Sequence, residues 1–177
     1  YFTYRMQWFA FVAWALYGIT LIAMLILQVV AMRTASTEAN LSNYLRDLLL
    51  SSRFGALWIV RILIWMLLGI VLSAWTQTGK ARGWLSLLLV TALLLLQSAQ
   101  SHAAATGLPL AAVTSDFLHL ALASLWIGGL LCMLVTLLTV PQGTGLRSAM
   151  VIPYSNYARL LLAGLFVTGL YAMSQAI

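Results

Sequence analysis

Five stretches of this sequence are long and apolar enough to cross a lipid bilayer, and they constrain the fold more than any other feature. They cover residues 6–32, 54–75, 84–100, 115–140 and 154–173. A helix that spans the hydrocarbon core needs about 20 mostly apolar residues, and it satisfies its backbone hydrogen bonds internally. The sequence therefore predicts an all-α fold, a polytopic transmembrane helical bundle with five spanning helices.

The composition excludes most other classes of protein. Of the 177 residues, 63% are hydrophobic and 7% are charged, whereas a soluble domain has roughly 25% charged residues. A net charge of +6 could suggest nucleic acid as a partner, but the basic residues are scattered between the apolar runs. We therefore expect the lipid bilayer as the partner and no nucleic acid. The single cysteine, Cys132, cannot form an intramolecular disulfide.

The connection between the first two spans has a pattern of its own. Residues 41–50 carry leucines and a tyrosine at helical spacing, with polar side chains on the other side. This pattern predicts a short amphipathic helix that lies in the membrane interface. We expect residues 1–177 to form a single transmembrane domain. Because the chain begins at Tyr1 and ends within an apolar run, we also expect it to be part of a longer chain.

Basic residues in short loops indicate the orientation. Lys80 and Arg82 lie between the second and third spans, and Arg147 lies between the fourth and fifth. The loop that contains His102 has no Lys or Arg. The positive-inside rule therefore places the Lys80/Arg82 loop in the cytoplasm and the His102 loop outside.

The chain has two histidines, and both are predicted near the outer surface. His102 follows the third span, while Asp116 and His119 begin the fourth and share one helix face because they are three residues apart. Short connections favour antiparallel neighbouring spans, so the two imidazoles would lie at similar depth. Neutral imidazole is a good ligand for copper, zinc and nickel. His102 and His119 are therefore the candidate metal ligands.

Structural interpretations of the same residues remain open at this point. Asp116 could complement the dipole of the first turn of its helix, with Thr114 or Ser115 as the cap. His119 could be a core histidine bonded to a carbonyl, and His102 could be a solvated interfacial residue. Asp116 could also support a metal from the second shell.

Several further residues could serve the same site or the bundle. Thioether sulfur suits monovalent copper, and Met32 and Met173 are predicted at the outer ends of the first and fifth spans, although methionine more often fills gaps in packing. Arg61 lies within the second span, so it must either reach the headgroups or pair with an acid. Asp116 is the leading candidate for that pair. Because the chain has three acidic residues and no nucleophile–base pattern, we do not expect an enzyme.

Three motifs resemble the copper-resistance protein D family of integral membrane proteins. The stretch from Ser52 to Arg61 resembles a helix start of that family, and Ser101-His102-Ala103-Ala104 resembles a helix exit. The stretch from Asp116 to Leu130 is similar to a third motif. At a fourth place the family often has Arg-Phe-Ser, whereas this chain has Pro153-Tyr154-Ser155. The motif positions are Arg53, Arg61, Asp116, His119, Trp126, Gly128 and Gly129.

The resemblance implies copper as the bound metal. It implies a multi-pass protein of the bacterial inner membrane, with the His102 loop periplasmic, that moves copper towards the cytoplasm beside a periplasmic copper-binding protein. His102, Asp116 and His119 would be the metal-linked residues. Family members usually have more spanning helices than the five predicted here.

Two other functions fit the residues. Histidines on neighbouring spans could ligate a haem in an electron-transfer subunit, which requires the imidazoles to face each other across the macrocycle. Alternatively, the chain could be a non-catalytic subunit of a larger membrane complex, with its histidines serving only as local hydrogen-bonding groups.

Overall fold

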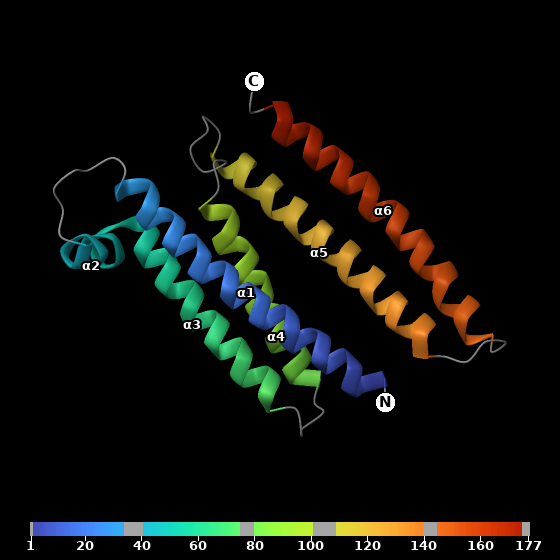
Figure 1. The fold of residues 1–177 in the computed structure, drawn as a ribbon. Helices are drawn as coiled ribbons and strands as arrows, with labels where there is room; N and C mark the ends of the chain where they lie inside the picture. Colours follow the sequence, from blue (N-terminus) through green and yellow to red (C-terminus); the bar gives the residue numbers. More distant parts are fainter. Residues whose placement is uncertain (1, 34–40, 75–79, 101–108, 140–144, 175–177) are drawn as a thin grey trace. The chain divides into compact units, whose positions relative to one another are not determined.

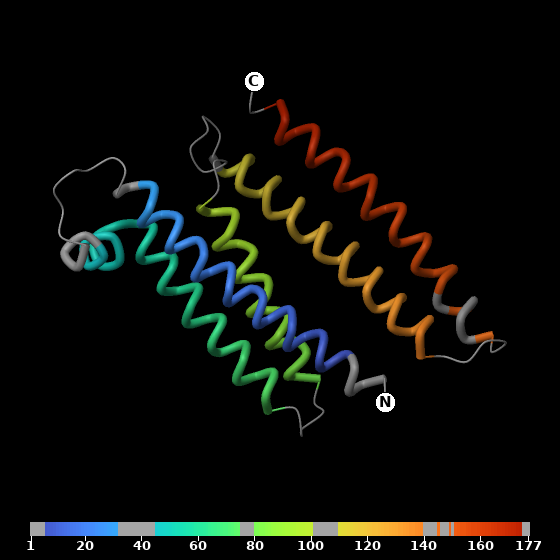
Figure 2. The backbone as a smooth tube through the Cα atoms, viewed as in Figure 1, coloured from blue at the N-terminus to red at the C-terminus, as the bar shows by residue number. Residues whose placement is uncertain are grey.

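The computed structural model describes residues 2–33, 41–74, 80–100, 109–139 and 145–174, and these residues form six α-helices (Figure 1). Figure 2 traces the same path through the Cα atoms. Within the described residues there is no strand, so the predicted all-α fold is confirmed. The helices are α1 (Phe2–Arg33), α2 (Leu41–Ser51), α3 (Arg53–Ser73), α4 (Lys80–Ala99), α5 (Pro109–Thr139) and α6 (Leu146–Ser174).

Five of these helices are long and apolar enough to span a membrane, as predicted. The spans are Met6–Ala31, Arg53–Ser73, Lys80–Ala99, Leu110–Thr139 and Val151–Ser174. The largest difference is at the fourth span, which was expected to start at residue 115. Helix α5 instead begins at Pro109, where proline is favourable because the first helical N–H needs no partner within the helix. The short amphipathic helix is α2.

The chain divides into two compact units. The amino-terminal unit comprises residues 7–96, and the carboxy-terminal unit comprises residues 1–6 and 97–177. The first contains most of α1, with α2, α3 and most of α4, whereas the second is built on α5 and α6.

A reciprocal pair of tryptophans joins α1 to α3. The rings of Trp14 and Trp65 are stacked, with centroids 4.5 Å apart and planes 5° apart. Each indole Nε1 donates a 2.9 Å hydrogen bond to the backbone carbonyl of the other tryptophan. Glycine makes room for each ring, since a Cβ at Gly18 would lie 2.5 Å from the Trp65 ring and one at Gly69 would lie 2.7 Å from the Trp14 ring.

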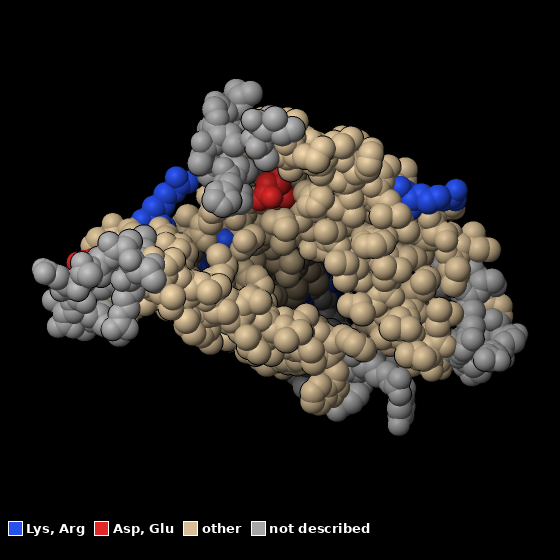
Figure 3. Space-filling view, turned by 45° about the horizontal axis from the view of Figure 1, so that its top comes forward, with Lys and Arg blue, Asp and Glu red and all other residues tan. Residues whose placement is uncertain are grey.

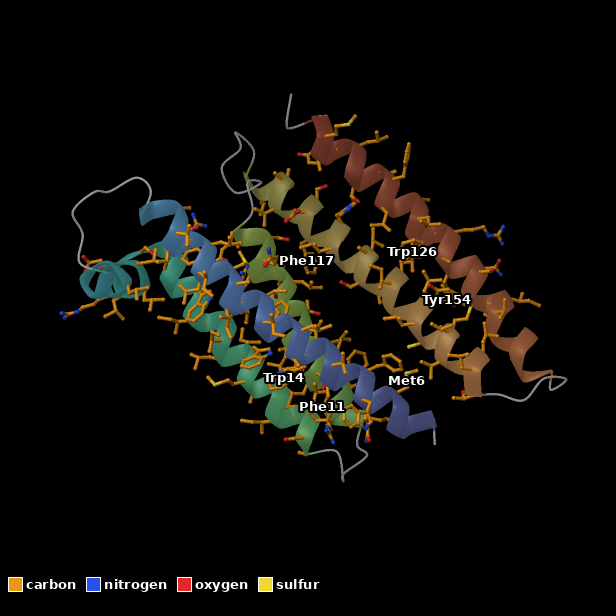
Figure 4. All side chains as sticks on the ribbon, in the orientation of Figure 1. Met6, Phe11, Trp14, Phe117, Trp126 and Tyr154 are labelled. Atoms are coloured by element: carbon orange, nitrogen blue, oxygen red, sulfur yellow. The ribbon has the colours of Figure 1, made fainter. Side chains whose placement is uncertain are left out.

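The same helix pair is held at a second level, and α4 completes the packing. Trp58 Nε1 donates a 3.0 Å hydrogen bond to the Leu21 carbonyl. Trp58 precedes Trp65 by seven residues, whereas Leu21 follows Trp14 by seven, as an antiparallel pair of helices requires. Leu68 of α3 packs with α4 in a buried cluster, against which side chains of α1 also lie (Figure 4). The cluster contains Leu68, Leu89 and Leu93, with Trp14, Tyr17, Ile64, Val71 and Leu72 around it.

Helix α2 joins α3 through a tight turn at the start of the motif from Ser52 to Arg61. Ser52 caps α3, because its Oγ accepts a 2.9 Å hydrogen bond from the N–H of Gly55. The same hydroxyl donates to the Leu48 carbonyl. Gly55 has no alternative in this geometry, since a Cβ would lie 2.2 Å from that carbonyl oxygen and 2.5 Å from Cα of Leu49. The Ser52 and Gly55 positions of the motif therefore fix how α2 meets α3.

The outer faces of the helices are apolar. Large hydrophobic side chains such as Leu16, Leu88, Leu125 and Phe166 are more than half exposed, and Thr168 is the one buried residue of the α6 span Val151–Ser174. Figure 3 shows charged side chains only in small areas of the visible face. Such an extent of exposed apolar surface is unsuited to water and suits hydrocarbon. The lipid bilayer is therefore the environment of these helices.

Candidate metal site

Helices α5 and α6 position the described part of the candidate site. Tyr154 of α6 lies on α5, where its hydroxyl donates a 2.7 Å hydrogen bond to the Trp126 carbonyl (Figure 4). A Cβ at Gly129 would lie 2.3 Å from the Tyr154 ring. One further contact follows along the pair, where a Cβ at Gly164 would lie 2.8 Å from the Leu122 side chain. These contacts set the register that brings His119 opposite α6.

His119 forms a hydrogen bond that the sequence did not reveal. Its Nδ1 lies 2.8 Å from Oγ1 of Thr168, a buried residue of α6. The Thr168 hydroxyl is also 2.9 Å from the Gly164 carbonyl, one turn back along α6. The hydrogen-bond partner of His119 Nδ1 is therefore a hydroxyl, whereas the structural interpretation of this histidine expected a carbonyl.

Asp116 lies one turn from His119 and does not lie in the first turn of its helix. Because α5 begins at Pro109, Asp116 is seven residues inside it, so the interpretation of Asp116 as a charge on the first turn is wrong. Thr114 is not the cap either, since its hydroxyl donates back to the Leu110 carbonyl at 2.7 Å. Asp116 Oδ2 is buried and has no hydrogen-bond partner among the described residues. A buried carboxylate oxygen without a donor is costly unless a cation or water satisfies it.

The structure does not place the other predicted ligands beside Asp116 and His119. His102 lies outside the described residues, and so does the side chain of Met32. Met173 is 61% exposed and follows Thr168 by five residues, which is about 140° around a helix of 3.6 residues per turn. Met173 therefore lies on a different face of α6 from Thr168.

Arg61 lies in the amino-terminal unit, is fully buried, and does not extend to an exposed position. Its Nη2 donates a 2.8 Å hydrogen bond to the Leu96 carbonyl, and its Nη1 lies 3.8 Å from Met24 Sδ. Asp116 belongs to the other unit, so the predicted ion pair between Arg61 and Asp116 stays a prediction.

The other motif positions have different structural roles. Arg53 begins α3 and is exposed. Trp126 contributes its carbonyl to Tyr154. Gly129 is required by the Tyr154 ring, whereas a Cβ at Gly128 would meet nothing within 4 Å among the described residues. Close packing therefore explains one of the two adjacent glycines.

The described residues offer two donor groups of the kind that a metal site uses. They contain no group of three or more His, Cys, Asp or Glu side chains that could hold a metal ion. His119 and Asp116 supply one imidazole and one carboxylate on the same face of α5. A borderline divalent metal accepts both ligand types, so the pair fits copper and requires at least one more ligand.

Comparison with known families decides what class of membrane protein this is. Residues 2–110 match the copper resistance protein D-like, N-terminal domain. The chain belongs to this family. Neither the curated proteins nor the solved structures give a match. The matched residues run from α1 to the start of α5 and include Arg53, Arg61 and His102.

The copper resistance protein D-like match and the motif resemblance cover different parts of the chain. The first helix, which the motifs did not include, lies inside the matched residues. The segment with Asp116, His119 and Trp126 lies beyond them. For this segment the argument rests on the motif and on the geometry of α5 and α6.

Thr168 is the residue of the site that the sequence argument missed. It is a hydroxyl residue within an apolar span, in the run Phe166-Val167-Thr168-Gly169. Polar side chains inside a membrane segment are informative because hydrocarbon penalises them, so its presence was a usable signal. The contact with His119 could not be predicted from the sequence, since it joins residues 49 positions apart on two different helices.

Proposed function

We propose that this copper resistance protein D-like chain accepts copper at the outer face of a bacterial inner membrane and helps to move it towards the cytoplasm. His102 and His119 supply the imidazole ligands, and Asp116 attracts the cation or completes its ligand set. Copper is the cargo in this proposal, and no catalytic reaction is assigned to the chain.

The family supports the choice of metal, and one structural observation carries the site. Asp116 Oδ2 is buried without a hydrogen-bond partner among the described residues, one helical turn from His119 on the same face of α5. A metal cation would satisfy this oxygen and would bind the imidazole as well. Water could satisfy the oxygen, but water alone gives no role to Nε2 of the neighbouring histidine, whose Nδ1 is bonded to Thr168.

The direction of transport follows from the predicted orientation. The loop with Lys80 and Arg82 is basic and the His102 loop has no Lys or Arg, which places the histidines on the periplasmic side. Copper would therefore be received from a periplasmic copper-binding protein. Met32 and Met173, at the outer ends of α1 and α6, are the methionines proposed to receive the reduced ion, and the Met173 side chain lies on a different face of α6 from Thr168.

The test is copper binding by the purified full chain in detergent. Elemental analysis gives the stoichiometry, and competition with a chromophoric chelator gives the affinity for Cu(I) and Cu(II). We expect bound copper in the wild type, loss of it in His119→Ala and in His102→Ala, and weaker binding in Asp116→Asn, because each substitution removes a donor atom from the site.

Ser124→Ala is the matched control, since Ser124 is a polar residue of the same helix whose hydroxyl bonds only its own helix, to the Leu120 carbonyl. Its copper content should equal that of the wild type. Unchanged stoichiometry in both histidine variants would overturn the site. Purification with a haem absorption band and no copper would instead support the electron-transfer hypothesis.

A further inference from the structure

The hydroxyl of Thr168 has one proton and three neighbouring atoms that could accept it. Oγ1 lies 2.9 Å from the Gly164 carbonyl and 3.2 Å from the Leu165 carbonyl of its own helix. It also lies 2.8 Å from Nδ1 of His119. A threonine hydroxyl inside a helix commonly donates to the carbonyl one turn back, and a hydroxyl that donates there can only accept from the imidazole.

The opposite assignment leaves an unfavourable contact. If Thr168 donated to Nδ1, its oxygen and the Gly164 oxygen would face each other at 2.9 Å with no proton between them. Two acceptor oxygens in contact without a donor are costly in an apolar helix pair, since hydrocarbon offers no water to supply the missing donor.

We propose that Thr168 fixes His119 in the tautomer with the proton on Nδ1 and thereby presents Nε2 as the metal-binding atom. This inference rests on the proposed function for the identity of the ligand at Nε2, but the tautomer itself is a property of the metal-free protein. Thr168 is a positioning residue, because it acts through His119 and does not touch the metal.

The surroundings of His119 fit this role. Thr168 is 9% exposed, so the hydrogen bond is shielded from competing water. A Cβ at Gly169 would stand 3.7 Å from Cε1 of the ring, so the edge of the ring between its two nitrogens lies beside α6 at van der Waals distance. Metal-binding histidines commonly donate their second N–H to a fixed acceptor, which sets both the tautomer and the ring orientation.

The decisive measurement is the tautomer of His119 in the metal-free full chain. Protein labelled with ¹⁵N-histidine is studied by NMR in detergent at alkaline pH, where imidazole is neutral, and the His102→Gln variant assigns the signals. We expect the wild type to carry the proton on Nδ1. A wild type protonated on Nε2 would overturn the inference without reference to any variant.

The variants then test Thr168 itself. Thr168→Val keeps the shape and removes the acceptor, so the Nδ1–H form should no longer dominate, whereas Thr168→Ser should retain it. Thr136→Val is the matched control: Thr136 is a buried residue of α5 whose hydroxyl bonds back to the Cys132 carbonyl at 2.8 Å. It should leave the tautomer unchanged. An unchanged tautomer in Thr168→Val would overturn the role of Thr168.

Copper binding provides a separate outcome. Removal of the residue that hydrogen-bonds the second nitrogen of a metal-binding histidine lowers metal affinity by about 10–100-fold. We therefore expect copper affinity to fall by this factor in Thr168→Val and to equal that of the wild type in Thr136→Val. Equal affinity in wild type and Thr168→Val would overturn the link to the metal. A wild type that has the expected tautomer and binds no copper would refute the proposed function while supporting the tautomer assignment.

Discussion

Arg61 is a charged residue inside an apolar helix, and its guanidinium donates a hydrogen bond to the carboxyl-terminal end of a neighbouring helix. Its acceptor, the Leu96 carbonyl, belongs to the last four residues of α4. Carbonyls at that place lack partners within the helix and form the negative end of its dipole. Arg82 acts similarly at the end of α3, where it donates to the carbonyls of Leu72 and Ala74 at 2.8 and 2.6 Å. Both arginines thus supply hydrogen-bond donors to carbonyls at the ends of helices.

We therefore expect Arg61→Ala to destabilise the amino-terminal unit. A hydrogen bond to a charged group contributes about 1.5–3 kcal/mol, so the free energy of unfolding should fall by about 2 kcal/mol. The midpoint of thermal unfolding in detergent should fall with it, and amide hydrogen exchange should accelerate in the last turn of α4. Arg53→Ala removes an exposed arginine from the same helix and should change neither measurement. Unaltered exchange in Arg61→Ala would contradict the assigned role.

Aromatic side chains lying on glycines hold the helices together in both units. Trp14 lies on Gly69, Trp65 lies on Gly18, and Tyr154 lies on Gly129. Each aromatic group also donates to a backbone carbonyl of the facing helix. Lipid tails are as apolar as leucine, so close packing and hydrogen bonds must supply the association that the hydrophobic effect supplies in water. A phenylalanine in place of Tyr154 would keep the packing and lose the hydrogen bond.

Gly128 and Gly129 provide a direct test of this packing at neighbouring positions. Gly129→Ala should destabilise the α5–α6 pair by about 1–3 kcal/mol, the usual cost of overpacking, because the new methyl would meet the Tyr154 ring at 2.3 Å. Gly128→Ala meets no described atom within 4 Å and should be neutral or stabilising by up to about 1 kcal/mol through helix propensity. Thermal unfolding in detergent measures both. Equal effects of the two variants would contradict the packing argument.

The proposed direction of transport depends on the sidedness of the whole chain. Arg82 is engaged at the end of α3, yet it still contributes its charge to the loop with Lys80. The positive-inside rule depends on this charge bias between loops, and it places the His102 loop outside.

Single cysteines in a Cys132→Ala background test this orientation. Thr106→Cys lies in the His102 loop and Thr78→Cys in the loop before Lys80. In intact bacterial cells a membrane-impermeant maleimide should label Thr106→Cys, and it should label Thr78→Cys only after permeabilisation. The reverse labelling pattern would show that the bundle has the opposite orientation, with the histidines on the cytoplasmic side. It would remove the basis for copper uptake from the periplasm.

Part of the geometry of the candidate site could be predicted from the sequence. The spacing of Asp116 and His119 places them on one face of any helix that contains both, so this part followed from backbone geometry. The depth of Asp116 within α5 did not follow, because the apolar run predicts a span that starts at residue 115, whereas the helix begins at Pro109, and proline is suited to the first turn of a helix. Thr168 was missed because its partner is distant in sequence.

The sequence by itself determined that this is an all-α membrane protein, because runs of some 20 apolar residues have no other stable environment. It did not determine which face of each helix is buried. In water the apolar face would be recognisable, but here lipid-facing and buried side chains are both apolar, so hydropathy does not distinguish them. The tertiary structure decided that Gly129 and not Gly128 packs closely, that Trp14 pairs with Trp65, and that Thr168 bonds His119. Each of these outcomes depends on the register between two helices, which is set by steric fit across the interface.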